Sequence, residues 1–223
     1  EELYHACQIA REIAMDDKWK VGRVIARPYI GTKEGHFTRT SNRHDYALAP
    51  FSKTALDSLK DAGLDVIGVG KIPDIFVDQG ITRKIKTVSN EDGMNKTIEL
   101  ASDNFNGLAF INLVDFDAVY GHRRNAAGYG KAIEEFDVQL GKLINELKND
   151  DLLMVTADHG NDPTYRGTDH TREQVPLIIY SKQFNEMKVL NDGDSFGIIG
   201  STICDNFNVK YNGIGSSILE LLK

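Results

Sequence analysis

Residues 152–162 read LLMVTADHGND, an apolar run that passes directly into carboxylate, imidazole and amide side chains. Residues 108–122, LAFINLVDFDAVYGH, repeat this form, a strand-like run followed by acids and a histidine. Between the two, residues 131–148 place apolar side chains on one face, at the spacing of an amphipathic helix. Strands that alternate with helices are typical of an α/β fold, so we predict a mostly parallel sheet flanked by helices.

The sequence on both sides of this core continues the alternation. We predict further strands at 64–69, 84–89 and 175–180 and further helices at 53–62, 91–104, 197–207 and 214–222. Gly63 is placed to end the first of these helices. Upstream, helical spacing over 2–17 predicts an amphipathic helix, 21–26 predicts a short strand, and 28–46 has no period and is interpreted as a loop or crossing segment.

The composition of the chain changes near residue 46, which indicates a domain boundary. Residues 1–46 hold too little apolar material for a core of their own, so we interpret them as the end of a smaller second domain. Residues 47–223 then form the larger part of the main domain. The chain begins within a helical pattern and without an initiator methionine, so we expect it to be a piece of a longer protein.

The composition also excludes several classes of protein. The chain has 223 residues and a net charge of −7, and this acidic balance argues against a non-specific nucleic-acid binder. No apolar run approaches the ~20 residues of a membrane span, and the N-terminal residues lack the layout of a signal peptide. Cys7 and Cys204 are too few for a disulfide scaffold. We therefore expect a cytoplasmic protein with no nucleic-acid and no membrane partner.

Carboxylates and histidines follow two of the predicted strands, at the end where open α/β sheets bind ligands. The first group holds Asp115 and Asp117 with His122, and the second holds Asp158, His159 and His170. Alternation along a strand puts the first two aspartates on the same face, so spacing does not choose between them. Mixed carboxylate and imidazole ligands suit Zn, Mn or Fe, and five ligands favour two metals rather than one. The alternative for any single Asp-His pair is a helix cap beside a surface histidine.

The motifs that contain these residues resemble those of the bacterial phosphopentomutases in the alkaline phosphatase superfamily. The resemblance runs along essentially the whole chain and is carried by ADHGNDP (157–163), GTDHTRE (167–173), DFD (115–117) with YGHRR (120–124), GRVIARP (22–28) and FTRT (37–40) through NRHDY (42–46). Asp-His-Gly is shared across the superfamily, whereas GTDHTRE and the arginine-rich segment are more specific. The resemblance implies an alkaline-phosphatase-like core, with residues 1–46 as the end of a smaller α/β cap domain.

The resemblance also implies roles for the site residues. Asp158 and His159 would bind one Mn²⁺, and Asp117, His122 and His170 would bind a second. The resemblance thus selects Asp117 rather than Asp115 as a ligand. Members of the family interconvert ribose or deoxyribose 1-phosphate and the 5-phosphate through a phosphorylated threonine. A sugar bisphosphate of the ribose 1,5-bisphosphate type is the implied activator.

Residues 20–44 carry six basic side chains against one acid, a charge of +5. Arginine grips a phosphate through two parallel hydrogen bonds, and the alternative is a solvated basic face. The resemblance favours substrate binding. It implies Arg23 and Arg39 at the substrate phosphate and Ile25 against the sugar, with Arg27 and Arg43 in support.

The family's nucleophilic threonine and a further metal-binding aspartate have no match in this chain. The resemblance therefore implies that both lie upstream and that the chain alone is inactive. We expect a portion of a phosphopentomutase, a phosphotransferase or isomerase of nucleotide metabolism, monomeric and with a pentose phosphate as partner. The alternatives are cofactor-independent phosphoglycerate mutase, a phosphatase or phosphodiesterase of the same superfamily, or a catalytically silent metal-binding fragment.

Overall fold

The computed structural model describes residues 1–223 except Asp17, Lys20, Ser41, Arg43 and Lys223. The chain forms two compact units. The first contains Glu1–Ser52 and Asp74–Gln79, and the second contains Lys53–Pro73 and Gly80–Lys223. Among the helices of the described residues, none combines the length and the apolar character that crossing a bilayer requires.

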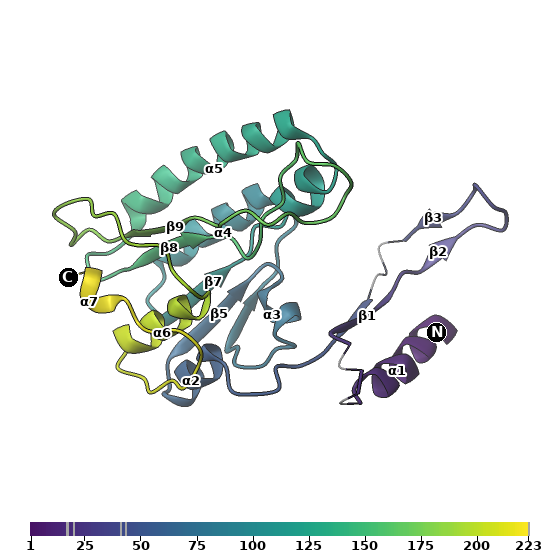
Figure 1. The fold of residues 1–223 in the computed structure, drawn as a ribbon, viewed down its shortest axis with the longest axis horizontal. Coiled ribbons are helices and arrows are strands. Elements are labelled where there is room, and N and C mark those ends of the chain that lie inside the picture. Colours follow the sequence, from purple (N-terminus) through teal and green to yellow (C-terminus); the bar gives the residue numbers. More distant parts are fainter. Residues whose placement is uncertain (17, 20, 41, 43, 223) are drawn as a thin grey trace. The chain divides into compact units, whose positions relative to one another are not determined.

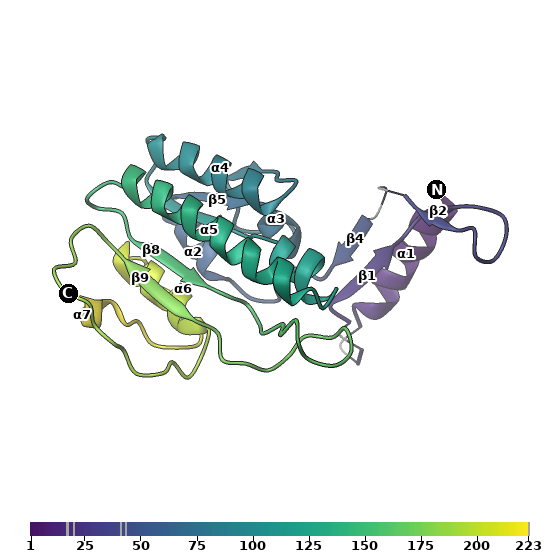
Figure 2. The ribbon, with the colours of Figure 1, turned by 90° about the horizontal axis from the view of Figure 1, so that it is seen from above.

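The first unit is a helix packed on short antiparallel strands (Figure 1). Its elements are α1 (Glu2–Ala14), β1 (Arg23–Ala26), β2 (Tyr29–Ile30), β3 (Thr38–Arg39) and β4 (His44–Ala47). β1 pairs with β4, β2 pairs with β3, and α1 packs along β1 (Figure 2). The interpretation of 28–46 as a loop is therefore wrong. β2 and β3 have two residues each, too few to leave an alternating pattern in the sequence, and β4 begins only at the end of the segment, at His44.

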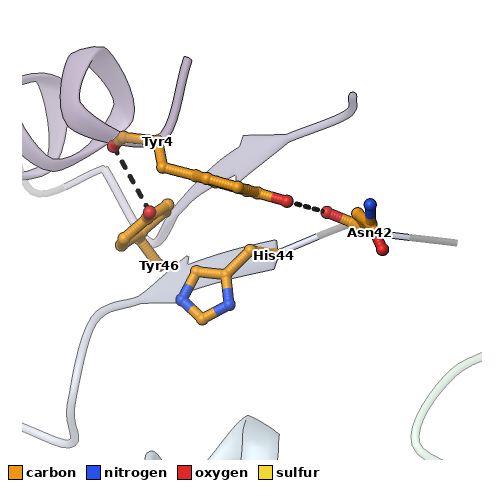
Figure 3. Close-up of a pocket in the computed structure, with 4 residues that line it drawn as sticks. All are labelled: Tyr4, Asn42, His44 and Tyr46. Carbon is orange, nitrogen blue, oxygen red and sulfur yellow. Dashed lines mark hydrogen bonds between the residues drawn. The ribbon is translucent and has the colours of Figure 1, made fainter. Parts of the chain in front are cut away.

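Aromatic side chains join α1 to β4 in this unit. The hydroxyl of Tyr46 donates to the carbonyl of Tyr4 at 3.3 Å, and the hydroxyl of Tyr4 donates to the carbonyl of Asn42 at 2.6 Å. The ring of His44 meets both tyrosine rings edge-on. These four residues line a shallow pocket of about 340 Å³ (Figure 3).

The second unit contains the parallel sheet that the sequence predicts. Its central strand, β5 (Asp65–Val69), lies between β6 (Arg83–Ile85) and β7 (Gly107–Ile111), and all three run parallel. Val66, Ile67 and Val69 are almost fully buried, because neighbouring strands and helices cover both faces of β5. This apolar run is the core of the unit.

Helices flank the strands of the second unit. They are α2 (Ala55–Asp61), α3 (Ile72–Ile75), α4 (Asn90–Ser102), α5 (Ala126–Glu146), α6 (Gly197–Asn206) and α7 (Leu219–Leu222). Figure 1 shows α4 and α5 on one side of β5 and α2 and α6 on the other. Thr54 and Asp57 form a capping box at the start of α2, and Gly63, at a φ of 80°, follows its end.

The predicted helix at 131–148 begins earlier than expected, at Ala126. Asn125 caps it by accepting a hydrogen bond from the amide of Gly128. The first five residues contain two glycines and carry no apolar stripe, so periodicity alone missed them. Capping chemistry rather than hydrophobic spacing decides where this helix starts.

β8 (Leu153–Thr156) and β9 (Leu177–Tyr180) form a separate two-stranded sheet and are antiparallel. The register pairs Leu153 with Tyr180 and Thr156 with Leu177. Most of their side chains are half-buried, in contrast to the buried run of β5. The segment that follows β8 and returns to β9 carries one half of the site described next.

Candidate metal centre

Asp117 lies on a π-helix, η1 (Phe116–Gly121), that follows β7, and His122 is the C-cap residue of that helix. The amide of His122 donates to the carbonyl of Asp117 at 2.9 Å, a hydrogen bond between residues five apart. This wide turn brings the two side chains together, with Nε2 of His122 3.3 Å from Oδ2 of Asp117. π-helical turns are rare and often occur at functional sites.

His159 and His170 come from the segment between β8 and β9. The amide of Thr171 donates to the carbonyl of Gly160 at 3.0 Å, so the residues next to the two histidines pair as an isolated bridge. The imidazole rings stack with centroids 3.7 Å apart. A Cβ at Gly160 would lie 2.9 Å from the carbonyl oxygen of Thr171 and 2.2 Å from the carboxylate of Glu173. The close approach therefore requires glycine at 160.

The two chain segments meet at Asp117. Nε2 of His170 lies 3.2 Å from Oδ1 of Asp117 and 3.2 Å from Nε2 of His122. Asp117, His159 and His170 each offer a ligand atom, and these atoms lie within 4.8 Å of one another. The side chains of Asp117, His122, His159 and His170 are 31–45% exposed, so a solute can reach them.

Backbone carbonyls orient two of the imidazoles. Nδ1 of His122 lies 2.5 Å from the carbonyl oxygen of Thr168, and Nδ1 of His159 lies 3.1 Å from that of Gly160. A carbonyl only accepts, so in the neutral ring each Nδ1 carries the hydrogen and Nε2 has the lone pair. Nε2 is then the ring atom that can bind a cation, and the Nδ1 contact to a carbonyl is the second-sphere arrangement usual for metal-bound histidine.

Asp158 lies at the margin of the cluster. Its side chain is 76% exposed, and Oδ2 lies 3.6 Å from Nε2 of His159. Asp115 has a different environment: its carboxylate accepts from the amide of Asn90 at 2.7 Å, and its own amide donates to the Asn90 side chain. The structure thus brings Asp117, rather than Asp115, to the histidines.

Two nearby groups have shifted pKa values. Hydrogen bonds from the hydroxyl and the amide of Thr164 lower the pKa of Asp162, so this carboxylate stays ionised. The same two hydrogen bonds stabilise the turn at residues 162–164, shortly after His159. Burial and then the charge of Asp117 raise the pKa of Tyr129. The phenol therefore remains protonated beside the cluster at neutral pH.

The residues expected to bind substrate belong to the first unit. Arg23 is exposed and Ile25 half-buried on β1, and Arg39 ends β3. Arg27 is exposed between β1 and β2, and Arg43 lies outside the described residues. The structure brings the metal-ligand candidates of the second unit together, whereas Arg23, Arg27 and Arg39 belong to the first unit.

Sequence reasoning did not single out Asn161 or Arg124. Asn161 is buried, and its Nδ2 donates to Oδ1 of Asp117 at 2.7 Å. Arg124 in turn donates to Oδ1 of Asn161 at 2.7 Å. Both residues adjoin candidate ligands in the sequence, but their types are not those of metal ligands at such a site. Only the fold reveals what they contact.

Comparison with known proteins supplies the family. A model of the metalloenzyme superfamily matches residues 24–211. A phosphopentomutase of Clostridium botulinum (strain Alaska E43 / Type E3) is 59% identical to the whole chain, one of Agathobacter rectalis 58%, and one of Clostridium beijerinckii 57%. The alignment covers all of this chain and 57% of each relative, so the chain spans little more than half of their length.

These matches confirm the resemblance that the motifs indicated. The alignment includes both units, since all of the chain aligns with each relative. The superfamily model likewise spans β1 to the segment after α6, and so includes both halves of the histidine cluster. The chain belongs to the metalloenzyme superfamily.

Proposed function

We propose that this chain supplies the metal-binding core and part of the cap of a phosphopentomutase, which interconverts ribose or deoxyribose 1-phosphate and the 5-phosphate. The convergence of Asp117, His122, His159 and His170 carries the proposal. It occurs in a chain 57–59% identical to proteins named phosphopentomutase. The enzyme would act in nucleotide metabolism in the cytoplasm, as a monomer without nucleic-acid or membrane partners.

The donor set fits a pair of divalent cations. Imidazole nitrogens and carboxylate oxygens together suit Mn²⁺, and the Nε2 atoms of His122 and His159 are unprotonated in the tautomers that their backbone partners favour. We assign Asp158 and His159 to one Mn²⁺, and Asp117, His122 and His170 to the other. The stacked rings of His159 and His170 support two neighbouring sites. Bound metals would neutralise charge on a transferring phosphoryl group.

The basic segment of the first unit would hold the phosphate that does not react. In this proposal Arg23 and Arg39 bind that phosphate and Ile25 contacts the sugar, with Arg27 and Arg43 in support. Binding energy from a remote phosphate can orient the reacting group as well as raise affinity. The nucleophilic threonine, a further metal-binding aspartate and the sequence around them would come from outside these 223 residues. The activator would be a ribose 1,5-bisphosphate-type sugar.

A substrate comparison tests the proposal. The complete encoded protein, loaded with Mn²⁺, is assayed with ribose 1-phosphate, 3-phosphoglycerate and p-nitrophenyl phosphate. We expect kcat/KM for ribose 1-phosphate to exceed the other two by at least about 100-fold, since a site that binds the ribose ring together with its phosphate makes contacts that the other two substrates cannot make. The 223-residue chain alone should bind Mn²⁺ and show no turnover, because it holds no phosphoryl-carrying nucleophile.

Four outcomes would contradict the proposal. Preference for 3-phosphoglycerate would assign the chain to the phosphoglycerate mutases of the superfamily, and preference for the nitrophenyl ester would assign it to the phosphatases. Turnover of ribose 1-phosphate by the 223-residue chain alone would place the nucleophile within it. Mn²⁺ binding without turnover of any substrate in the complete protein would indicate a catalytically silent metal-binding protein.

A further inference from the structure

Arg124 lies at the junction between η1 and α5, and its guanidinium is almost entirely used within the protein. It donates at 2.5–3.1 Å to the carbonyl oxygens of Gly121, Asp162, Gly167 and Asp169 and to the Asn161 side chain. A guanidinium has five N–H groups. Nε meets one of these acceptors, Nη1 meets three and Nη2 meets one, so one N–H of Nη2 is the capacity left for a further partner. Its contacts point to a role within the site.

The acceptors lie on both sides of the histidine cluster. Gly121 belongs to η1, which carries Asp117, whereas Asp162, Gly167 and Asp169 belong to the segment that joins His159 to His170. One side chain therefore ties the two halves of the candidate metal centre together. Planar, rigidly spaced donors suit such a task better than the single flexible ammonium of lysine.

Two hydrogen-bonded paths lead from Arg124 to candidate ligands. In the first, Nη1 donates to Oδ1 of Asn161, and Nδ2 of Asn161 donates to Oδ1 of Asp117 at 2.7 Å. In the second, Arg124 holds the carbonyls of Gly167 and Asp169. The carbonyl between them, that of Thr168, is the partner of His122 Nδ1. Arg124 thus orients the Asp117 carboxylate through Asn161, and it orients the His122 imidazole through the backbone around Thr168.

The backbone at Arg124 also indicates a specific need for this residue. Its φ is +51°, in the left-handed region that side chains other than those of Gly, Asn and Asp adopt rarely. The turn is closed by the amide of Arg124, which donates to the carbonyl of Gly121 at 3.0 Å. A residue kept in an unfavourable backbone conformation beside a site suggests that its side chain is required there.

We propose that Arg124 is a positioning residue of the metal centre, which fixes the Asp117 carboxylate and the His122 imidazole in their metal-binding orientation. The proposal rests on the proposed metal site, but not on the identity of the sugar phosphate. Arg124 contacts neither metal nor substrate itself. It sets the geometry of the ligands through Asn161 and through the carbonyl of Thr168.

The experiment compares Arg124→Asn and Arg124→Lys with the control variants Arg123→Asn and Arg123→Lys in the complete encoded protein. Asparagine tolerates the left-handed backbone, so Arg124→Asn removes the guanidinium without straining the turn. Arg123 is the exposed neighbour, which makes its variants a matched control. The affinity for Mn²⁺ is measured by electron paramagnetic resonance of the free ion. The visible spectrum with saturating Co²⁺ reports the ligand geometry.

We expect Arg124→Asn to raise the Kd for Mn²⁺ by about 10–100-fold, the range for loss of a partner that orients a metal ligand. Arg124→Lys should rescue the affinity only in part, because a point charge cannot hold five acceptors. The Co²⁺ spectra of both should differ from that of the parent protein even at saturation, which a merely stabilising role would not cause. The Arg123 variants should match the parent protein in both measurements.

Unchanged Mn²⁺ affinity and Co²⁺ spectrum in Arg124→Lys would overturn the proposal, whatever the fate of Arg124→Asn. Failure of both variants to fold would also overturn it, because the side chain would then serve folding rather than the site. The proposed function fails by a different measurement, the substrate comparison. If the parent protein turns over no sugar phosphate while Arg124→Asn still loses Mn²⁺ affinity, only the proposed function is wrong.

Discussion

The basic segment 20–44 of the first unit and the loop 158–171 of the second both carry residues proposed for function, but they are stabilised differently. In the loop, the Arg124 side chain donates to the carbonyls of Asp162, Gly167 and Asp169, and the amide of Asp162 donates to the Thr171 hydroxyl at 2.7 Å. In the segment, the backbone is held by the β1–β4 and β2–β3 ladders and by two hydrogen bonds from Thr40 to the carbonyl of Pro28.

Function can be inferred from side-chain geometry in the loop, but not in the basic segment. The loop side chains converge because hydrogen bonds draw their backbone together, so their chemistry follows from the distances between them. Along the segment, Tyr29, Ile30 and Phe37 remain more than half exposed. The roles of its arginines therefore rest on sequence similarity. The predictions below test the two regions against each other.

The largest effect is expected for His170→Ala, because the ring of His170 contacts Asp117, His122 and His159. We expect the Kd for Mn²⁺ to rise by ~10³-fold, beyond the ~10–100-fold cost of losing an outer partner. Isothermal titration calorimetry measures it, and His36→Ala, an exposed histidine of the basic segment, is the control. Equal Mn²⁺ affinity in the two variants would show that His170 is not a metal ligand.

Two isoleucine-to-alanine substitutions, one in each unit, compare how much side-chain packing stabilises each unit. Ile67 is 1% exposed on β5, whereas Ile30 is 64% exposed on β2. We expect Ile67→Ala to lower the free energy of unfolding by about 2–5 kcal/mol, through lost burial and a cavity. Ile30→Ala should change it by less than about 0.5 kcal/mol. Urea denaturation followed by circular dichroism measures both. A large effect of Ile30→Ala would mean that the segment is packed in the complete protein.

The arginine prediction separates substrate binding from metal binding. Arg39→Ala in the complete protein should lower kcat/KM for ribose 5-phosphate by ~10²-fold, in line with ~1.5–3 kcal/mol for a charged hydrogen bond. The Mn²⁺ content, measured by elemental analysis, should remain that of the parent protein. Arg23→Ala should behave in the same way. Near-normal kcat/KM in both variants would mean that the segment is a solvated basic face and does not bind the substrate.

The smallest effect concerns the two thiols, one in each unit. Cys204 is 1% exposed, and burial raises the pKa of its thiol, whereas Cys7 is 9% exposed beneath a much smaller core. Since the thiolate is the reactive form, we expect Cys204 to react with Ellman's reagent at least about 10-fold more slowly than Cys7. The variants Cys7→Ser and Cys204→Ser isolate each rate. Equal rates would mean that the two units open equally readily.

Much of the fold was predictable because burial leaves a pattern. The apolar run 64–69 predicted β5, and the stripe at 131–148 predicted most of α5. The strands β2 and β3 escaped prediction because a two-residue ladder leaves no such pattern. The π-helix η1 escaped as well. Its spacing follows from the five-residue hydrogen bond between His122 and Asp117, which no hydrophobic period encodes.

The sequence by itself determined the α/β class, the two strand ends that carry carboxylates and histidines, and the family resemblance. Each of these depends on residue types and spacing along the chain, which are local properties. Only the tertiary structure decided that Asp115 binds the start of α4 while Asp117 meets His170, and that Arg124 ties η1 to the loop after β8. The pairs Asn90–Asp115, Arg124–Gly167 and Asp117–His170 are 25, 43 and 53 positions apart. They depend on hydrogen-bond directions that only the folded backbone sets, because sequence spacing does not encode the orientation of a side chain at a strand end.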